Sequence, residues 1–168
     1  LVILGAGANR NNIQKELKNF FQKTGIPFIS TQMGKGAFDE NSPLCIGATG
    51  IAQGDFAHLA LRHADALIII GHDVINTPPI ILTPESLPKC KVIHVNFFSS
   101  AAKDVYIPTH EVVGDISNTL LVLTKKIKVN PAWDFKYFFK VRDFWKKDIT
   151  KFSDSTEFPL RPERIIGD

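Results

Sequence analysis

The residues with the clearest chemical potential form a glycine-rich turn near the start of the chain, Gly5-Ala6-Gly7-Ala8-Asn9-Arg10, directly after an apolar run. Two glycines let backbone N–H groups approach a phosphate at the N-terminus of a helix. A dinucleotide-binding fingerprint would also need glycine or alanine in place of Arg10, and an acidic residue after the second strand, where the chain has Ser30-Thr31-Gln32. These departures disfavour a standard NAD dehydrogenase. A nucleotide site and a tight turn without a ligand both stay open.

A second glycine-rich loop, residues 33–36, carries Lys35. The loop is not a P-loop, because Ile29 stands where the first glycine is required and Gly36 stands where serine or threonine is required. Lys35 has the charge to meet an anionic group from this loop. We nevertheless expect it to be a solvated surface lysine.

The five histidines predict no metal site. His58 and His63 are five residues apart, which places them on different faces of a helix. His72 follows an apolar strand that ends at Gly71, which makes it the best histidine for a ligand contact. His94 lies within a strand, and we expect it to be a hydrogen-bonded core residue.

The sequence does not indicate nucleophilic catalysis either. Cys45 and Cys90 have neither a CxxC spacing nor a neighbouring histidine base, so we expect them to be packing residues. There is no serine nucleophile elbow and no convincing pair of carboxylates. The residues alone therefore predict a ligand-binding or scaffold domain with no catalytic residue and no metal ligand.

The composition is that of a globular domain. The chain has 168 residues, of which 44% are hydrophobic, and 13 of them are phenylalanine, which is enough apolar surface for a core. A net charge of +3 with both signs interspersed indicates no nucleic-acid partner, and the longest apolar run, residues 66–70, is too short to cross a membrane. Two cysteines fit a reducing compartment. Because the chain begins inside an apolar run and its single methionine is Met33, we expect a piece of a longer polypeptide.

The elements that position these residues alternate between apolar strands and amphipathic helices. Strands are predicted at 1–4, 27–31, 66–70, 92–95 and 111–113. Strands of this kind separated by helices indicate a parallel sheet covered on both faces. The chain therefore predicts an α/β fold, a Rossmann-like doubly wound parallel sheet of five to six strands. Ligands of such sheets bind beyond the carboxyl ends of the strands.

Helical spacing of apolar residues predicts the connecting helices. The first has Asn11 or Asn12 as its N-cap and ends before Gly25, and two others begin after Asp55 and Asp115. Their predicted buried faces are, in order, Ile13, Leu17, Phe20 and Phe21; Phe56, Leu59, Ala60 and Ala64; and Ile116, Leu120, Leu123 and Ile127. A glycine-rich turn is predicted at 47–54.

A different segment opens at Asn130-Pro131, so we divide the chain into a domain of residues 1–129 and an appendage of residues 130–168. The appendage predicts an aromatic-faced helix followed by a linker. The apolar stripe of the helix is Phe135, Phe138, Val141, Trp145, Ile149 and Phe152. We expect it to pack on its own domain or a neighbour, because acidic residues interrupt its basic face. If the indole is buried, Trp145→Ala should lower stability by about 3–5 kcal/mol.

A series of short motifs resembles the central domain of thiamine-diphosphate-dependent enzymes of the acetolactate synthase and pyruvate oxidase group. The resemblance covers roughly residues 1–127 and is greatest to the large, catalytic subunit of acetolactate synthase. The motifs are Leu4-Gly5-Ala6-Gly7-Ala8, Thr24-Gly25-Ile26-Pro27, Thr31-Gln32-Met33-Gly34-Lys35-Gly36-Ala37-Phe38, Pro43-Leu44, Gly47, Gly50, Ala64-Asp65, Ile70-Gly71-His72-Asp73, Ile93-His94-Val95-Asn96 and Val113-Gly114-Asp115. Residues 158–165 resemble the connector to the family's C-terminal thiamine-diphosphate-binding domain.

The resemblance implies an intact enzyme of three domains, a homodimer or tetramer in the cytoplasm, with a small regulatory subunit as a further partner. The flanking domains would bind thiamine diphosphate and Mg²⁺. The enzyme would decarboxylate pyruvate and condense the product with a second 2-oxo acid, as in branched-chain amino acid biosynthesis. This chain alone would be structural and inactive. The alternatives are the central domain of another thiamine enzyme, such as pyruvate oxidase, a decarboxylase or an oxalyl-CoA-type lyase, and a stand-alone FAD- or nucleotide-binding module.

Some members of the family bind FAD on this domain. The resemblance implies these contact positions: Gly5, Ala6, Gly7, Thr31, Gly47, Gly50, Gly71, His72, Asp73, Gly114 and Asp115. Flavin-binding relatives carry a Gly-Ala-Arg-Phe-Asp-Asp-Arg type of run after the third strand, and its arginine meets the pyrophosphate. The run here is Gly71-His72-Asp73-Val74-Ile75-Asn76, which resembles flavin-free members. We therefore expect no FAD.

Overall fold

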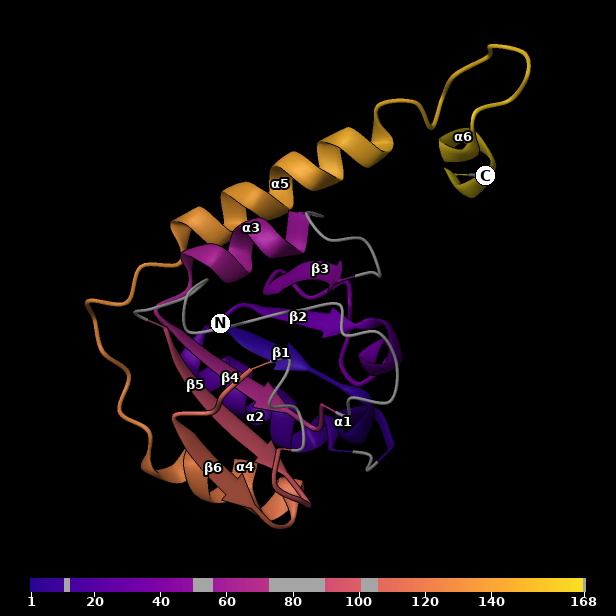
Figure 1. The fold of residues 1–168 in the computed structure, drawn as a ribbon. Helices are drawn as coiled ribbons and strands as arrows, with labels where there is room; N and C mark the ends of the chain where they lie inside the picture. Colours follow the sequence, from indigo (N-terminus) through magenta and orange to yellow (C-terminus); the bar gives the residue numbers. More distant parts are fainter. Residues whose placement is uncertain (11–12, 50–55, 73–89, 101–105, 168) are drawn as a thin grey trace.

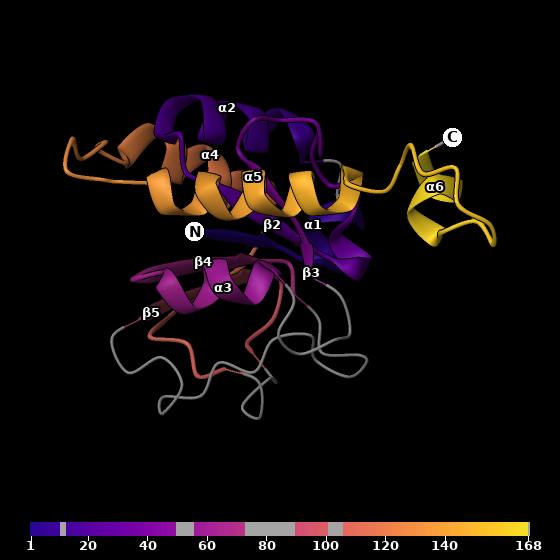
Figure 2. The ribbon, with the colours of Figure 1, turned by 90° about the horizontal axis from the view of Figure 1, so that it is seen from above.

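The computed structural model describes residues 1–10, 13–49, 56–72, 90–100 and 106–167. These residues fold around a six-stranded parallel sheet with helices on both faces (Figures 1 and 2). This is the doubly wound α/β architecture that the alternation of apolar strands and amphipathic helices predicts.

The sheet is built from strands that are not consecutive in space. They are β1 (Val2–Leu4), β2 (Phe28–Thr31), β3 (Cys45–Thr49), β4 (Ala66–Ile70), β5 (Lys91–Asn96) and β6 (His110–Val113). The order across the sheet is β3-β2-β1-β4-β5-β6, and every neighbouring pair is parallel. The chain runs outward from β1 to β3 and then crosses back to place β4 on the other side of β1. The topological switch point, where such folds bind ligands, therefore lies between β1 and β4.

β3 corrects the prediction of a glycine-rich turn at residues 47–54. In its register with β2, Phe28 pairs with Cys45 and Ile29 pairs with Gly47, so Ile46 is an extra residue. Gly47 has a φ of +143° at this irregularity. Glycine is typical of turns and also of strand bulges, so the local sequence does not distinguish the two. Here the pairing with β2 keeps the chain extended. Residues 50–54 lie outside the described part of the chain.

Helices cover both faces of the sheet. They are α1 (Ala6–Arg10), α2 (Gln14–Thr24), the 3₁₀ turn η1 (Gln32–Gly34), α3 (Phe56–His63), α4 (Ile116–Lys126), α5 (Lys136–Thr150) and α6 (Pro162–Gly167). The core has two halves: α2 and α4 pack on one face of the sheet, and α3 with α5 packs on the other (Figure 2). None of these helices is long and apolar enough to cross a membrane.

The first helical region differs in detail from the prediction. Of residues 5–8, expected to form a tight turn, residues 6–8 already lie in the single-turn helix α1. The N-cap position of α2 is Ile13, which makes no side-chain cap hydrogen bond, and the expected asparagine caps lie outside the described residues. The other end agrees with the prediction: Gly25 has a φ of +64° and its N–H donates to the Phe21 carbonyl over 2.8 Å.

The predicted buried face is correct for α4 and partly wrong for α3. Asp115 caps α4, with one carboxylate oxygen accepting the Asn118 N–H over 2.6 Å. In α3, Leu59 is 43% exposed, while its neighbour Leu61 is 1% exposed. The buried stripe of α3 consists of Ala57, Ala60 and Leu61. The small alanines let α3 lie close to the sheet, which turns Leu59 outward. The expected cap, Asp55, lies outside the described residues.

The strand β6 and the helix α5 differ in how far they are buried. All four residues of β6 are exposed, so this edge strand contradicts the expectation of strands covered on both faces. α5 packs on α3 and β3, with Phe138 and Val141 buried in the same cluster as α3. Phe135, Trp145 and Phe152 are half-buried, and the Ile149 side chain is not described. The aromatic helix α5 therefore packs on the same domain as α3 and β3. The domain boundary after residue 129 stays a prediction.

Candidate functional site

The turns that end β1 and β4 meet at the topological switch point. The Gly5 N–H donates to the Ile70 carbonyl over 2.8 Å, and the Gly7 N–H donates to the Gly71 carbonyl over 2.6 Å. The two turns are thus joined by their own backbones at the position where a ligand of a doubly wound fold would lie.

Glycine is required here because no side chain fits between the two backbones. A Cβ atom on Gly5 would lie 2.5 Å from the Cα of His72, and one on Gly7 would lie 2.9 Å from the Cα of Gly71. Gly71 has a φ of +64°, and a Cβ there would lie 2.3 Å from the Ala8 nitrogen. The glycines therefore serve a backbone-to-backbone contact within the chain.

The loop after β2 closes the same edge. A Cβ on Gly34 would lie 2.0 Å from the Leu4 carbonyl oxygen. The Thr31 hydroxyl accepts the Gly34 N–H over 3.1 Å, and the Asn9 side-chain amide donates to the Lys35 carbonyl over 2.9 Å. Lys35 itself is exposed and lies 3.4 Å from Glu40, as expected for a surface lysine. Three loops are thus held together where β1, β2 and β4 end.

His72, the histidine expected to touch a ligand, lies in the interior and is 6% exposed. Its carbonyl accepts from the Asn96 side chain over 3.2 Å, and its ring centre lies 5.8 Å from that of Tyr106. The space between Ile3, Ile69, His72 and Tyr106 leaves no room for a water molecule. The side chain of His72 is therefore closely packed by its neighbours.

His94 is the core histidine that the sequence predicts. It is 1% exposed, its Nδ1 lies 2.8 Å from the Tyr106 hydroxyl and its Nε2 lies 3.0 Å from the Phe98 carbonyl oxygen. Both ring nitrogens are therefore engaged. Sequence reasoning missed Tyr106, which has no motif around it, because its partners come from other strands.

The remaining predicted contact positions are scattered. Gly47 lies under α5, where an added Cβ would meet the Trp145 ring at 3.4 Å. The Gly114 N–H donates to the Asn96 carbonyl over 2.8 Å, and Asp115 is occupied as the cap of α4. Gly50 and Asp73 lie outside the described residues. The structure thus brings together Gly5, Ala6, Gly7, Gly71 and His72, and leaves Gly47 and Asp115 away from them.

The two cysteines are protonated packing residues. Burial raises the pKa of the Cys45 thiol and of the Cys90 thiol, so both stay protonated and unreactive near neutral pH. No three His, Cys, Asp or Glu residues in the described ranges lie together in a way that could hold a metal ion. At the sheet edge the N–H groups of Gly5, Gly7 and Ala8 all donate to carbonyls within the chain.

One open groove of about 410 Å³ lies near the start of α2. Its lining includes Lys15, Lys18 and Asp39. Because the groove carries charges of both signs, it indicates no particular ligand charge.

Comparison with known proteins shows which domain family the chain belongs to. A family model described as "Thiamine pyrophosphate enzyme, central domain" matches residues 1–123. The chain is 26% identical, over 100% of its length, to a protein of Methanocaldococcus jannaschii described as "Probable acetolactate synthase large subunit", covering 28% of that protein. It is 29% identical, over 95% of its length, to the acetolactate synthase large subunit of Porphyra purpurea, covering 26% of it. The chain therefore spans about a quarter of the length of these relatives.

A human relative carries a different activity in its name. The chain is 26% identical to 2-hydroxyacyl-CoA lyase 1 of Homo sapiens, over 80% of this chain and 22% of the lyase. Among solved structures, an enzyme from Mycobacterium smegmatis described as thiamin diphosphate-dependent matches 78% of this chain and 25% of its own, with a TM-score of 0.63 and 20% identity, which establishes a shared fold. Because the family model matches most of the chain, this protein belongs to the family of thiamine pyrophosphate enzyme central domains.

Proposed function

We propose that this chain is the structural middle domain of a larger thiamine-diphosphate-dependent enzyme of the acetolactate synthase type. The observation that carries the proposal is the match of the central-domain family model to residues 1–123, and the backbone contact of Gly5 and Gly7 with the turn at Gly71 supports a packing role for these glycines. The acetolactate synthase subunits among its relatives, about four times as long, support the presence of further domains.

In this proposal the flanking domains bind thiamine diphosphate and Mg²⁺, and the intact enzyme decarboxylates pyruvate and joins the product to a second 2-oxo acid. The cofactor supplies the electron sink for decarboxylation. The residues of this chain pack and position, and the isolated chain is inactive. A homodimeric or tetrameric assembly, association with a small regulatory subunit and a cytoplasmic location belong to the same proposal.

The test uses the full-length protein that contains this chain, supplied with thiamine diphosphate, Mg²⁺ and pyruvate. We expect acetolactate to form with the full-length protein and not with residues 1–168 alone. The human relative supplies the competing activity, so a 2-hydroxyacyl-CoA is the second substrate. Cleavage of that thioester without turnover of pyruvate would identify a lyase, and a full-length protein that does not bind thiamine diphosphate would overturn the whole proposal.

A further inference from the structure

The two outermost strands of the sheet, β3 and β6, differ in what covers them. We propose that the edge strand β6 is a surface through which two copies of this chain associate, with β6 of one copy running antiparallel to β6 of the other. The inference goes beyond the proposed function, because it assigns a contact surface and its occupant. It does not depend on which reaction the longer enzyme performs.

The edge at β3 is protected in two ways. The helices α3 and α5 pack on β3. Arg142 of α5 donates to the Pro43 carbonyl just before the strand, and the Trp145 ring lies over Gly47. The register of β3 is also broken by the extra residue Ile46. A covering helix and a bulge are both devices that keep an edge strand from pairing with another chain.

In the part of the chain that the structure describes, β6 has neither a bulge nor a helix packed on it as α5 packs on β3. It pairs with β5 over all four of its residues without a register shift. Each of the four is exposed, including Val112 at 39% and Val113 at 51%. The strand also contains no proline and no lysine, which are residues that block pairing at sheet edges. β6 therefore offers backbone N–H and C=O groups next to β-branched side chains, which favour a further strand.

A second copy of this chain fits the free edge because such an edge is complementary to itself. Two β6 strands related by a two-fold axis perpendicular to the sheet run antiparallel and exchange N–H···O=C hydrogen bonds. The axis must pass through a residue, so that each face of the sheet continues into the other copy. A pairing centred on Val112 sets Val112 opposite Val112, and Glu111 opposite Val113 of the other copy. Centring on His110 or Glu111 would instead set two histidines or two carboxylates opposite each other, which disfavours those registers.

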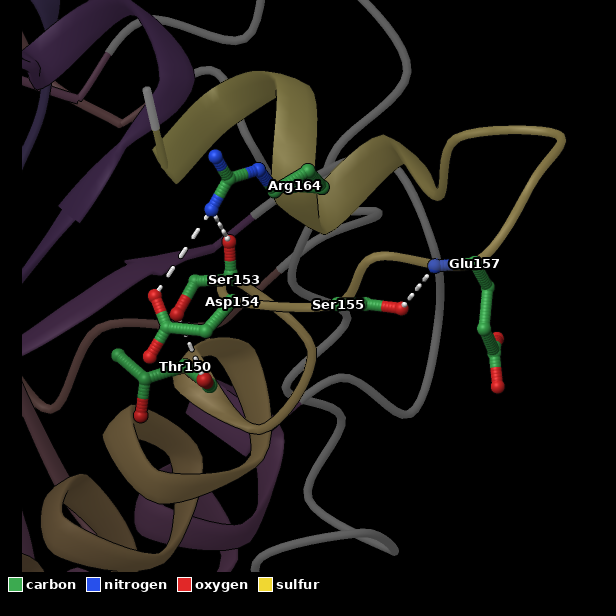
Figure 3. A network of polar contacts seen from close by, with 6 residues as sticks. All are labelled: Thr150, Ser153, Asp154, Ser155, Glu157 and Arg164. Atoms are coloured by element: carbon green, nitrogen blue, oxygen red, sulfur yellow. Dashed lines mark hydrogen bonds and ion pairs between the residues drawn. The ribbon is translucent and has the colours of Figure 1, made fainter.

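The most exposed large apolar side chain of the described residues lies far from β6. It is Phe158, which is 92% exposed and belongs to the segment after α5. In this segment Arg164 donates to the Ser153 carbonyl over 3.0 Å and lies 4.0 Å from the Asp154 carboxylate (Figure 3). The helix α6 and the strand β6 stand at opposite ends of the molecule (Figure 1). A contact through Phe158 is therefore a separate possibility, which the experiment distinguishes from a contact through β6.

Sedimentation of residues 1–168 at concentrations between about 1 µM and about 1 mM tests the proposal. We expect a reversible equilibrium between monomer and dimer in this range, because a pair of short strands buries little surface. Val112→Lys should weaken the dimer at least about tenfold, because it sets two lysines opposite each other. Val122→Lys is the matched control and should leave the equilibrium unchanged, since Val122 lies on α4 and is also 39% exposed.

A cysteine variant tests the register in the full-length protein. Val112→Cys should form a disulfide between two copies under oxidised glutathione, because residues on the axis face each other across about 4.5–5.5 Å. Val122→Cys should form none. The inference is overturned if residues 1–168 stay monomeric throughout, if Val112→Lys leaves the dimer intact, or if Val112→Cys does not cross-link. It is also overturned if Phe158→Ser dissociates the dimer, because the contact would then lie in the C-terminal segment.

Discussion

At the scale of single residues, glycines with the same backbone angle have different reasons to be glycine. Gly25 and Gly71 both have a φ of +64°. Nothing lies within 4 Å of a Cβ placed on Gly25, whereas a Cβ on Gly71 would lie 2.3 Å from the Ala8 nitrogen. Gly25 is therefore required by conformation alone, and Gly71 by conformation and by contact with another turn.

This pair gives the first prediction. Gly25→Ala should lower the free energy of unfolding by about 1–2 kcal/mol, the cost of a left-handed conformation for a residue with a Cβ. Gly71→Ala should cost about 2–3 kcal/mol more, because the two turns must separate. Urea unfolding of both variants measures the difference. Equal losses would mean that the turns relax apart easily and that the switch point is not closed.

The amino group of Leu1 gives the second prediction, for protein made to begin at this residue. Burial lowers its pKa from 8.0 to about 6, against the opposing attraction of Asp65, and it donates to the Ala66 carbonyl over 2.9 Å. The unfolded chain binds this proton more tightly, so stability should fall as the pH decreases from 8 to 6. The loss amounts to about 2–3 kcal/mol.

Acetylation of Leu1 is the matched control, because it removes the charge and keeps an N–H for Ala66. The difference in unfolding free energy between the two forms should widen as the pH falls through this window. A constant difference would show that the amino group stays solvated.

At the scale of elements, α5 demonstrates how one helix joins the domain through one part of its length. Phe138 and Val141 are buried with α3, while Phe144 is 63% exposed. Trp145 is half-buried and lies over Gly47, where an added Cβ would be in ordinary contact with the indole. The periodic aromatic stripe predicts that the helix packs on its own domain or a neighbour. The exposure of the Trp145 indole depends on its position at the edge of β3.

The half-buried indole sets the third prediction. Trp145→Ala should lower the free energy of unfolding by about 2 kcal/mol, less than the 3–5 kcal/mol of a fully buried aromatic residue. Phe144→Ala, the change at the neighbouring exposed position, should cost well under about 1 kcal/mol. Urea unfolding distinguishes them. Equal small losses would show that α5 is not fastened to β3 at this point.

At the scale of the whole molecule, three loops meet at the sheet edge where doubly wound folds bind ligands. The loops after β1, β2 and β4 approach each other through Gly5, Gly34 and Gly71. The domain thus keeps the topology of a dinucleotide-binding fold while its switch point serves as a packing contact.

This closure gives the fourth prediction. The purified full-length protein, and residues 1–168, should show no flavin absorbance in the visible range after incubation with FAD and removal of the excess. The same measurement after release with acid detects flavin that is tightly held. A yellow protein with one FAD per chain would require the turns at Gly7 and Gly71 to open, and would contradict the proposed structural role.

The sequence alone predicts much of this architecture. Five strands, the helices that follow them and the parallel sheet come from hydrophobic periodicity, which is a local signal. The buried role of His94 and the cap at Asp115 come from position within predicted elements. The predictions of a turn in place of β3 and of a buried Leu59 were wrong. A strand bulge at Gly47 and close helix packing on alanines both depend on neighbours that are distant in the sequence.

What the amino-acid order determined by itself is therefore most of the elements, without β3, and the family, since both reside in short motifs along the chain. Only the tertiary structure decided the meaning of the glycines. Residues 5–8 and 71–72 are more than sixty positions apart, and no local pattern distinguishes a glycine that admits a phosphate from one that admits another strand's turn. That distinction is made by backbone contact across the sheet edge, which exists only once β1 and β4 lie side by side.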